Sequence, residues 1–198
     1  MKSIDVKGTA RVASGKKGAR EIRKTGAVPC NLYGVEKDEN GQPVAKSFTV
    51  TQEGLRKLVY TPDIYSVNLN IDGKECKAIM KELQFHPVTD KLLHVDFYEI
   101  TEEKPIVMEV PIKLNGLAEG VKAGGKLAAN VRKLKVRAPY TRIPERLDID
   151  VTNLGLGKTI KAAELKFEGL ELMTSPSVVV CQVKMTRSAM SAAAKKDE

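Results

Sequence analysis

The residues best suited to chemistry in this chain are cations gathered near its N-terminus. Six basic side chains flank a glycine-containing turn and a short predicted helix: Arg11, Lys16, Lys17, Arg20, Arg23 and Lys24. On a helix, Arg20, Arg23 and Lys24 stand at i, i+3 and i+4, which places them on one face. Lysine and arginine neutralise phosphates, and the planar fork of arginine also reads base edges. Because only Glu21 interrupts the charge, the pattern favours contact with RNA or DNA over a solvated helix face.

The positive charge of the whole chain is concentrated in two blocks. The 198 residues carry 33 Lys and Arg against 25 Asp and Glu. Residues 1–35 hold eight basic and two acidic side chains, and residues 122–146 hold eight and one. A solvated surface mixes signs more evenly, so the first block predicts a nucleic-acid footprint. In the second block, Lys133, Lys135 and Arg137 alternate along a strand and share a face. For these three, contact with RNA and a plain solvated face are equally good interpretations.

The two histidines are the natural candidates for catalysis or metal binding, but no motif accompanies them. His86, His94 and Asp96 would form a minimal metal set without the helical HExxH spacing, and the chain has no GxSxG elbow. His94 and Asp96, two residues apart on a predicted strand, point to the same face. There they could bond a ribose hydroxyl or a base edge, or form a structural pair inside a barrel. The spacing leaves both interpretations open.

Other patterns that would indicate a cofactor or a metal are incomplete. A loop ending in Gly157-Lys158-Thr159 resembles a phosphate-binding loop, yet Thr152 stands where the first glycine is required. We therefore expect a surface loop. Cys30, Cys76 and Cys181 are odd in number, widely separated and without a CxxC pair. They predict neither a disulfide framework nor a zinc site, but reduced thiols in a cytoplasmic protein. No metal, cofactor or small-molecule substrate is predicted.

The composition excludes a membrane or secreted protein. Hydrophobic residues make up 42% and charged residues 29% of the chain, the ordinary balance of a soluble globular protein. The longest apolar run, Val178 to Cys181, is far shorter than the ~20 residues needed to span a bilayer. The charged N-terminus lacks the apolar stretch of a signal peptide.

The aromatic residues indicate what kind of nucleic acid to expect. There are nine, five Tyr and four Phe, scattered along the sequence. A single-strand binder stacks successive bases on clustered aromatic side chains. The scatter therefore favours a folded RNA that presents a groove.

The elements that must position these residues form two segments. Residues 101–105, charged and ending in proline, predict a joint between a domain at 1–100 and one at 101–187, with a flexible tail at 188–198. In the first domain we expect many short strands with two helices, in a closed or nearly closed barrel. The predicted elements are a strand from Ile4, a helix at 18–25, strands at 28–34 and 46–50 around a loop that turns near Asn40-Gly41, a helix at 52–60 capped by Thr51, a hairpin at Asp72-Gly73 and a strand at 93–99.

The second domain reads almost entirely as β-structure. Predicted strands cover residues 106–114, 131–138, 147–151 and 177–184, separated by turns that contain glycine or proline. Residues 162–166 predict a single helical turn.

Several motifs in a fixed order resemble a known family. They are Gly18–Gly26, Val28-Pro29, Leu32-Tyr33-Gly34, Gln84-Phe85-His86-Pro87, His94-Val95-Asp96-Phe97, Met108-Glu109-Val110-Pro111, Glu119–Gly125, Ile143-Pro144-Glu145 and Leu147–Val151. The family is that of the bacterial large-subunit ribosomal proteins that bind 5S rRNA, in the long two-domain form also called the general stress protein Ctc family. The resemblance covers essentially residues 3–185.

The resemblance implies a mainly β protein with an N-terminal barrel of six or seven strands, two or three short helices and a β-rich C-terminal domain. It implies a barrel bound in the widened minor groove of loop E of 5S rRNA. It places Arg11, Lys24, Tyr33, His94 and Asp96 on that RNA, and the neighbouring candidates are Lys16, Arg20, Arg23 and Gln84. Lys24 stands where some members have arginine, so a fork contact there becomes a point charge.

The favoured function is therefore a non-catalytic structural protein that helps anchor 5S rRNA in the large ribosomal subunit. The alternative is a tRNA- or stress-linked regulatory RNA binder whose second domain recruits a protein. A small hydrolase that uses His86, His94 and Asp96 is the third and least favoured interpretation.

Overall fold

The chain folds into two compact units. The computed structural model describes residues 1–11, 15–35, 41, 44–101 and 104–187. The first unit comprises Met1–Ile106 with Pro139–Thr141, and the second comprises Val107–Ala138 with Arg142–Glu198. The predicted tail at 188–198 and the predicted turn at Asn40 lie outside the described residues.

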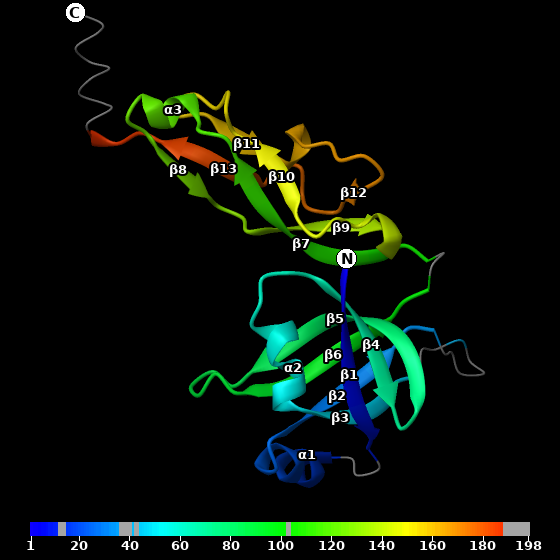
Figure 1. Ribbon diagram of the computed structural model, residues 1–198. Coiled ribbons are helices and arrows are strands. Elements are labelled where there is room, and N and C mark those ends of the chain that lie inside the picture. The colour runs from blue at the N-terminus through cyan, green and yellow to red at the C-terminus, as the bar shows by residue number, and fades with distance from the viewer. Residues whose placement is uncertain (12–14, 36–40, 42–43, 102–103, 188–198) are drawn as a thin grey trace, which may run out of the picture. The chain divides into compact units, whose positions relative to one another are not determined.

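The first unit is a closed barrel of six strands (Figure 1). The strands are β1 (Lys2–Ala10), β2 (Ala27–Tyr33), β3 (Lys46–Thr51), β4 (Tyr65–Ile71), β5 (Lys74–Phe85) and β6 (Leu92–Glu99). Their order around the barrel is β1-β3-β2-β6-β5-β4. Strand pairs β1–β4 and β2–β6 are parallel, and the other four are antiparallel. The barrel predicted from the sequence is confirmed.

Alternating apolar residues fill the interior of the barrel. On β6, Val95 and Phe97 are fully buried, whereas Asp96 between them is only partly so. Phe97 packs against Phe48 of β3, with ring centroids 5.7 Å apart. Leu55 and Leu58, from the helix α2 (Gln52–Val59), belong to the same core. Burial of each such side chain stabilises the fold by about 1.5–3 kcal/mol. The free energy therefore favours the arrangement with the apolar side chains inside, and because successive residues of a strand alternate between faces, the residues between them face outward.

Local signals in the sequence set the ends of several elements. The hydroxyl of Thr51 accepts a hydrogen bond from the Gly54 amide at 3.3 Å and caps α2 as predicted. The β4–β5 hairpin turns through Asp72 and Gly73, whose φ angles of 48° and 88° suit the predicted two-residue turn. The helix α1 (Gly15–Lys24) begins three residues earlier than predicted, because the two lysines after Gly15 are good helix formers.

The second unit consists of two sheets, which confirms a β-rich second half. One sheet has the order β10-β7-β9-β12, and the other has the order β11-β13-β8. The elements are β7 (Ile106–Asn115), α3 (Glu119–Lys122), β8 (Lys126–Ala129), β9 (Lys133–Ala138), a 3-10 turn at Tyr140–Arg142, β10 (Leu147–Asp150), β11 (Thr159–Lys161), a 3-10 turn at Ala162–Glu164, β12 (Glu171–Leu172) and β13 (Val179–Lys184). The elements α3, β8, β11 and β12 were not predicted, because two to four residues are too few to show a period.

Candidate RNA-binding surface

His94 and Asp96 lie side by side on the outer face of β6. The Nδ1 atom of His94 is 3.6 Å from an Oδ1 of Asp96, and the two side chains are 18% and 21% exposed. Val95, between them, is buried in the barrel core. The alternative of a structural pair inside the barrel is therefore wrong, and both side chains are open to a partner outside it.

Strand register places further polar residues next to this pair. On β5, Gln84 stands opposite His94 and Glu82 stands opposite Asp96. On β2, Asn31 is the register partner of Asp96, and Tyr33 that of Tyr98. The rings of Tyr33 and Tyr98 meet edge to face, with centroids 5.9 Å apart. Three strands thus bring Tyr33, Gln84, His94 and Asp96 to one outer surface.

The helix α1 adds cations to this surface, and one of them, Arg23, is hydrogen-bonded to β6. The Arg23 Nε atom donates a hydrogen bond to the Leu93 carbonyl at 3.0 Å, directly before His94. The helix itself packs against β2 and buries none of its side chains. Lys16, Arg20 and Lys24 are exposed and pair with no acidic side chain in the part of the chain that the structure describes. They remain available for phosphates.

Hydrogen bonds link Arg11 to Ser47 and Ser47 to Asn31, and strand register then places Asn31 beside Asp96. The Arg11 amide donates to the Ser47 carbonyl at 3.0 Å. The Ser47 hydroxyl donates to Asn31 Oδ1 at 3.0 Å, and Asn31 is the register partner of Asp96. We call the whole surface the polar wall. It comprises Arg11, Lys16, Arg20, Arg23, Lys24, Asn31, Tyr33, Ser47, Glu82, Gln84, His94 and Asp96.

Sequence reasoning missed three members of the polar wall, Asn31, Ser47 and Glu82. A signal was present for Asn31, because it alternates with buried residues of β2 and so shares a face with Tyr33. For Glu82 no such signal existed. A register shift in β5 between Met80 and Glu82 moves the carboxylate to the face of Asp96.

The carboxylates of the polar wall act on its other groups. Partial burial raises the pKa of Tyr33, and the nearby charges of Asp96 and Glu82 raise it further. The phenol therefore keeps its proton at neutral pH and can donate a hydrogen bond. Burial, with a smaller contribution from Asp96, raises the pKa of the Cys30 thiol to about 12, so this thiol is inert. The polar wall thus offers both acceptors and donors beside its cations.

His86 has a different task from His94. Its Nδ1 atom accepts hydrogen bonds from the Val88 and Thr89 amides, both at 3.2 Å. Its own amide donates to the Lys91 carbonyl at 2.8 Å, which closes the β5–β6 hairpin. His86 therefore holds a loop in shape, and it does not combine with His94 and Asp96 as the hydrolase hypothesis required.

The residues that the structure describes do not form a metal site, a phosphate-binding loop or a membrane-spanning helix. No three His, Cys, Asp or Glu side chains there come close enough to hold a metal ion. The loop ending in Gly157-Lys158-Thr159 leads into β11, a strand, whereas a phosphate-binding loop leads into a helix. None of the described helices has the length and hydropathy required to cross a bilayer.

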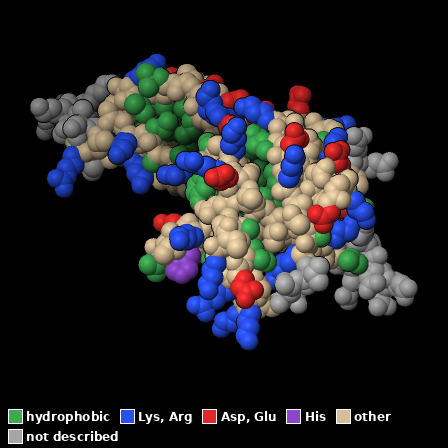
Figure 2. Space-filling model, turned by 60° about the horizontal axis from the view of Figure 1, so that its bottom comes forward, with side chains coloured by type: hydrophobic (Ala, Val, Ile, Leu, Met, Phe, Trp, Pro, Cys, Tyr) green, Lys and Arg blue, Asp and Glu red, His purple; other side chains and the backbone are tan. Residues whose placement is uncertain are grey.

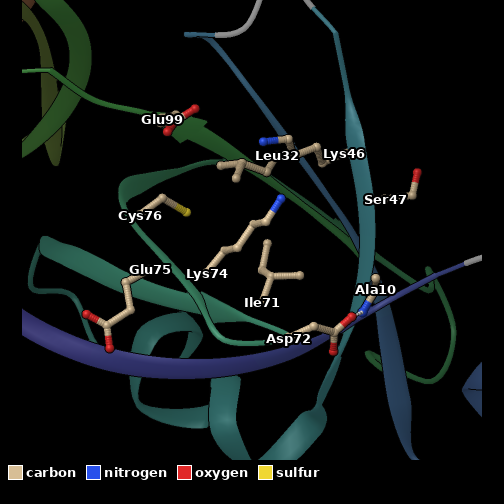
Figure 3. Close-up of a pocket in the computed structure, with 10 residues that line it drawn as sticks. All are labelled: Ala10, Leu32, Lys46, Ser47, Ile71, Asp72, Lys74, Glu75, Cys76 and Glu99. Carbon is tan, nitrogen blue, oxygen red and sulfur yellow. Dashed lines mark hydrogen bonds between the residues drawn. The ribbon is translucent and has the colours of Figure 1, made fainter.

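A hollow of about 730 Å³ at one end of the barrel is the other candidate site (Figure 3). Lys46 and Lys74 line it above an apolar base that includes Leu32 and Ile71. Its rim also carries three carboxylates: Asp72, Glu75 and Glu99. Since these outnumber the two lysines, the hollow does not suit a polyanion.

The second basic block of the sequence is partly neutralised. Lys133, Lys135 and Arg137 share the exposed face of β9 as predicted. The Lys135 Nζ atom lies 3.7 Å from a Glu109 carboxylate oxygen, and an Arg137 nitrogen lies 4.0 Å from one of Glu171. Two of the three cations of this face are thus paired with carboxylates of neighbouring strands. Space-filling views show Lys and Arg side chains over both units, mixed with acidic ones (Figure 2).

Comparison with known proteins accounts for both halves of the chain. Residues 6–97 match the Ribosomal L25p family, and residues 105–187 match the C-terminal domain of ribosomal protein TL5. The large ribosomal subunit protein bL25 of Phocaeicola vulgatus is 66% identical over 194 residues, 98% of each chain. Those of Bacteroides thetaiotaomicron and Porphyromonas gingivalis are 60% and 53% identical, over 98% and 99% of this chain and 98% and 100% of their own. The chain therefore belongs to the bL25 family of large ribosomal subunit proteins, in the long form that carries both domains.

Proposed function

We propose that the protein binds 5S rRNA through the polar wall and helps to anchor that RNA in the central protuberance of the large ribosomal subunit. The observation that carries the proposal is the convergence of the α1 cations with Tyr33, Gln84, His94 and Asp96. These groups come from a helix and three strands, and they meet on one outer surface of the barrel.

The chemistry of the polar wall fits a shallow RNA groove. Lysine and arginine on α1 neutralise the phosphates, which positions the protein without reading sequence. Asp96 accepts hydrogen bonds, and a ribose 2′-hydroxyl or a guanine amino group in the minor groove can donate them. Tyr33, Gln84 and Asn31 supply donors for the acceptors in the same groove. The widened minor groove of loop E is the target that this arrangement of groups supports.

Family membership supports a structural role. The relatives are named as large ribosomal subunit proteins over nearly their full length. The protein is accordingly a ribosomal component without enzymatic activity, and its partners are rRNA and neighbouring ribosomal proteins. We place it on ribosomes in the cytoplasm.

The test is a protection footprint of the full chain on 5S rRNA, together with gel shifts that use tRNA as competitor. We expect protection over loop E and preference for 5S rRNA. The Asp96→Ala variant should lose about 1–3 kcal/mol of binding free energy, because RNA donors lose their acceptor. Asp5→Ala is a matched control, since Asp5 bonds Asn68 on another part of the barrel. Equal affinity for tRNA, or equal loss in both variants, would reject the proposal.

A further inference from the structure

Three large apolar side chains lie exposed at one end of the barrel, beside the polar wall. Tyr60 is 57% exposed, Phe85 41% and Val88 83%. Tyr60 follows the last residue of α2, and Phe85 is the last residue of β5. The fold brings these two rings together across 25 positions of sequence, with centroids 6.5 Å apart. Burial in the core therefore does not explain them.

The rings of Tyr60 and Phe85 do not cover each other, and both side chains are exposed to solvent. Their planes are inclined by 56°, so they do not stack on one another. Phe85 is held in place by the hairpin that follows it, in which the Nδ1 atom of His86 accepts hydrogen bonds from two backbone amides. In the same hairpin, Asp90 adopts a φ of 52°, and its amide bonds the His86 carbonyl at 3.0 Å. The aromatic pair is thus presented on a shaped support.

The surroundings of the aromatic pair favour an anionic partner. Tyr60 donates its amide to the Arg56 carbonyl, and Lys57 lies in the same helical turn. Lys91 lies across the hairpin from His86. All three cations are exposed, and the described turn from His86 to Lys91 contains a single carboxylate, that of Asp90.

The aromatic pair is also continuous with the polar wall. Phe85 directly follows Gln84, whose register partner is His94. Neighbouring residues of a strand point to opposite faces, and the register partner of Phe85 is the core residue Leu92, so the Phe85 ring lies at the end of the barrel beside the face of Gln84 and His94 and not on that face. An RNA on the polar wall would therefore reach the ring by extending past the end of the barrel.

We propose that Tyr60 and Phe85 form a stacking platform for an unpaired base of the RNA that the polar wall binds. The inference rests on the proposed function and extends it. Aromatic faces beside cations bind an unstacked base, because every base offers a π-face and its phosphate meets the cations. The polar wall then grips the groove of the RNA, while the platform holds a nucleotide outside the helical stack.

The experiment compares full-length variants for binding to 5S rRNA in gel shifts. Phe85→Leu and Tyr60→Leu keep an apolar side chain but remove the ring, and Phe85→Tyr and Tyr60→Phe keep the ring. We expect each leucine variant to bind about fivefold more weakly or worse, and the aromatic exchanges to bind as the unaltered protein does. Chemical probing of the RNA should show one unpaired base protected by the unaltered protein and reactive with Phe85→Leu.

Val88→Ser tests whether Tyr60, Phe85 and Val88 instead bind an aliphatic surface of a protein. Because Val88 is the most exposed of the three, a protein-like apolar contact would suffer as much from this change as from Phe85→Leu, and that result would overturn the platform. Unchanged binding of both leucine variants, while Asp96→Ala binds weakly, would also overturn it and leave the polar wall intact. If the unaltered protein shows no preference for 5S rRNA over tRNA, the proposed function itself fails.

Discussion

Two surfaces of this protein, the strand β9 and the helix α1, each carry several cations on one face, yet they differ in what the cations contact. On β9, Lys135 and Arg137 lie opposite the carboxylates of Glu109 and Glu171 on neighbouring strands. On α1, Arg20 and Lys24 pair with no acidic side chain among the residues that the structure describes. Two of the three cations of β9 are therefore paired, whereas the cations of α1 retain their charge.

The comparison shows that a local excess of charge is not by itself a binding site. Exposed ion pairs contribute little stability, about 0–1 kcal/mol each, but they occupy the cations that phosphates would need. On the polar wall, burial raises the pKa of Tyr33, and the carboxylates of Asp96 and Glu82 raise it further. The cations Lys16, Arg20 and Lys24 keep no acidic partner among the described residues and therefore remain available there.

The largest expected difference between the two surfaces comes from matched arginine variants. Arg23→Ala should lose about 1–3 kcal/mol of binding free energy for 5S rRNA, because a cation next to His94 disappears. Arg137→Ala should lose less than about 0.5 kcal/mol, since its charge is already paired. Gel shifts at one fixed salt concentration measure both changes.

A control separates charge from folding in the first variant. Arg23→Lys keeps the charge but cannot reproduce the bond of the Nε atom to the Leu93 carbonyl, so we expect an intermediate loss. Circular dichroism should show that all three variants stay folded. Equal losses for Arg23→Ala and Arg137→Ala would erase the distinction between the surfaces.

Salt dependence sharpens the same comparison. If about five cations contact phosphate, the logarithm of the binding constant should fall with the logarithm of salt concentration at a slope near about −4. The double variant Arg20→Gln, Lys24→Gln should reduce the steepness by about 1.4–1.8, which is about 0.7–0.9 per contact. The double variant Lys133→Gln, Lys135→Gln should leave the slope unchanged. A smaller slope for the second pair would mean that β9 also meets the RNA.

The smallest expected effect concerns the pKa of Tyr33. Asp96→Asn removes one of the negative charges that raise this pKa, so the phenol should lose its proton at a lower pH. Alkaline titration followed by ultraviolet absorbance, with Tyr33→Phe used to subtract the other tyrosines, measures the change.

The same shift links Tyr33 to stability. Because its pKa is higher in the folded state, its contribution is complete below the ordinary phenol pKa and is lost as the pH rises through the folded value. Asp96→Asn should weaken this dependence at alkaline pH. An unchanged titration in this variant would show that the carboxylate of Asp96 does not act on Tyr33.

Much of the fold could be predicted from local patterns. The alternation of Val67, Leu69 and Ile71 into Asp72-Gly73 defines a hairpin, and Thr51 defines the start of α2, since both signals act over a few residues. The short elements of the second unit carry no such signal, because β12 has only two residues. The strand β12 exists through pairing with β9, and β8 and β11 exist through pairing with β13, all with partners that are distant in sequence.

The aromatic residues show where a pattern in one dimension misleads. They are scattered along the sequence, which argued against clustered stacking. In the fold, Tyr33 meets Tyr98, Phe48 meets Phe97 and Tyr60 meets Phe85. Two of these pairs are brought together by neighbouring strands and by the core of the barrel, so distance along the chain says little about distance in space.

By itself, the sequence determined the barrel, the basic helix and the shared face of His94 and Asp96, because periodicity, capping and turn preferences act between close neighbours. Only the tertiary structure decided that this face is the outer one, that Asn31 and Glu82 join it and that Arg23 lies against it. It also decided that Lys135 and Arg137 of β9 are paired with carboxylates. These facts depend on strand register and on contacts between distant segments, in which the free energy of burying the core selects one arrangement of the whole chain.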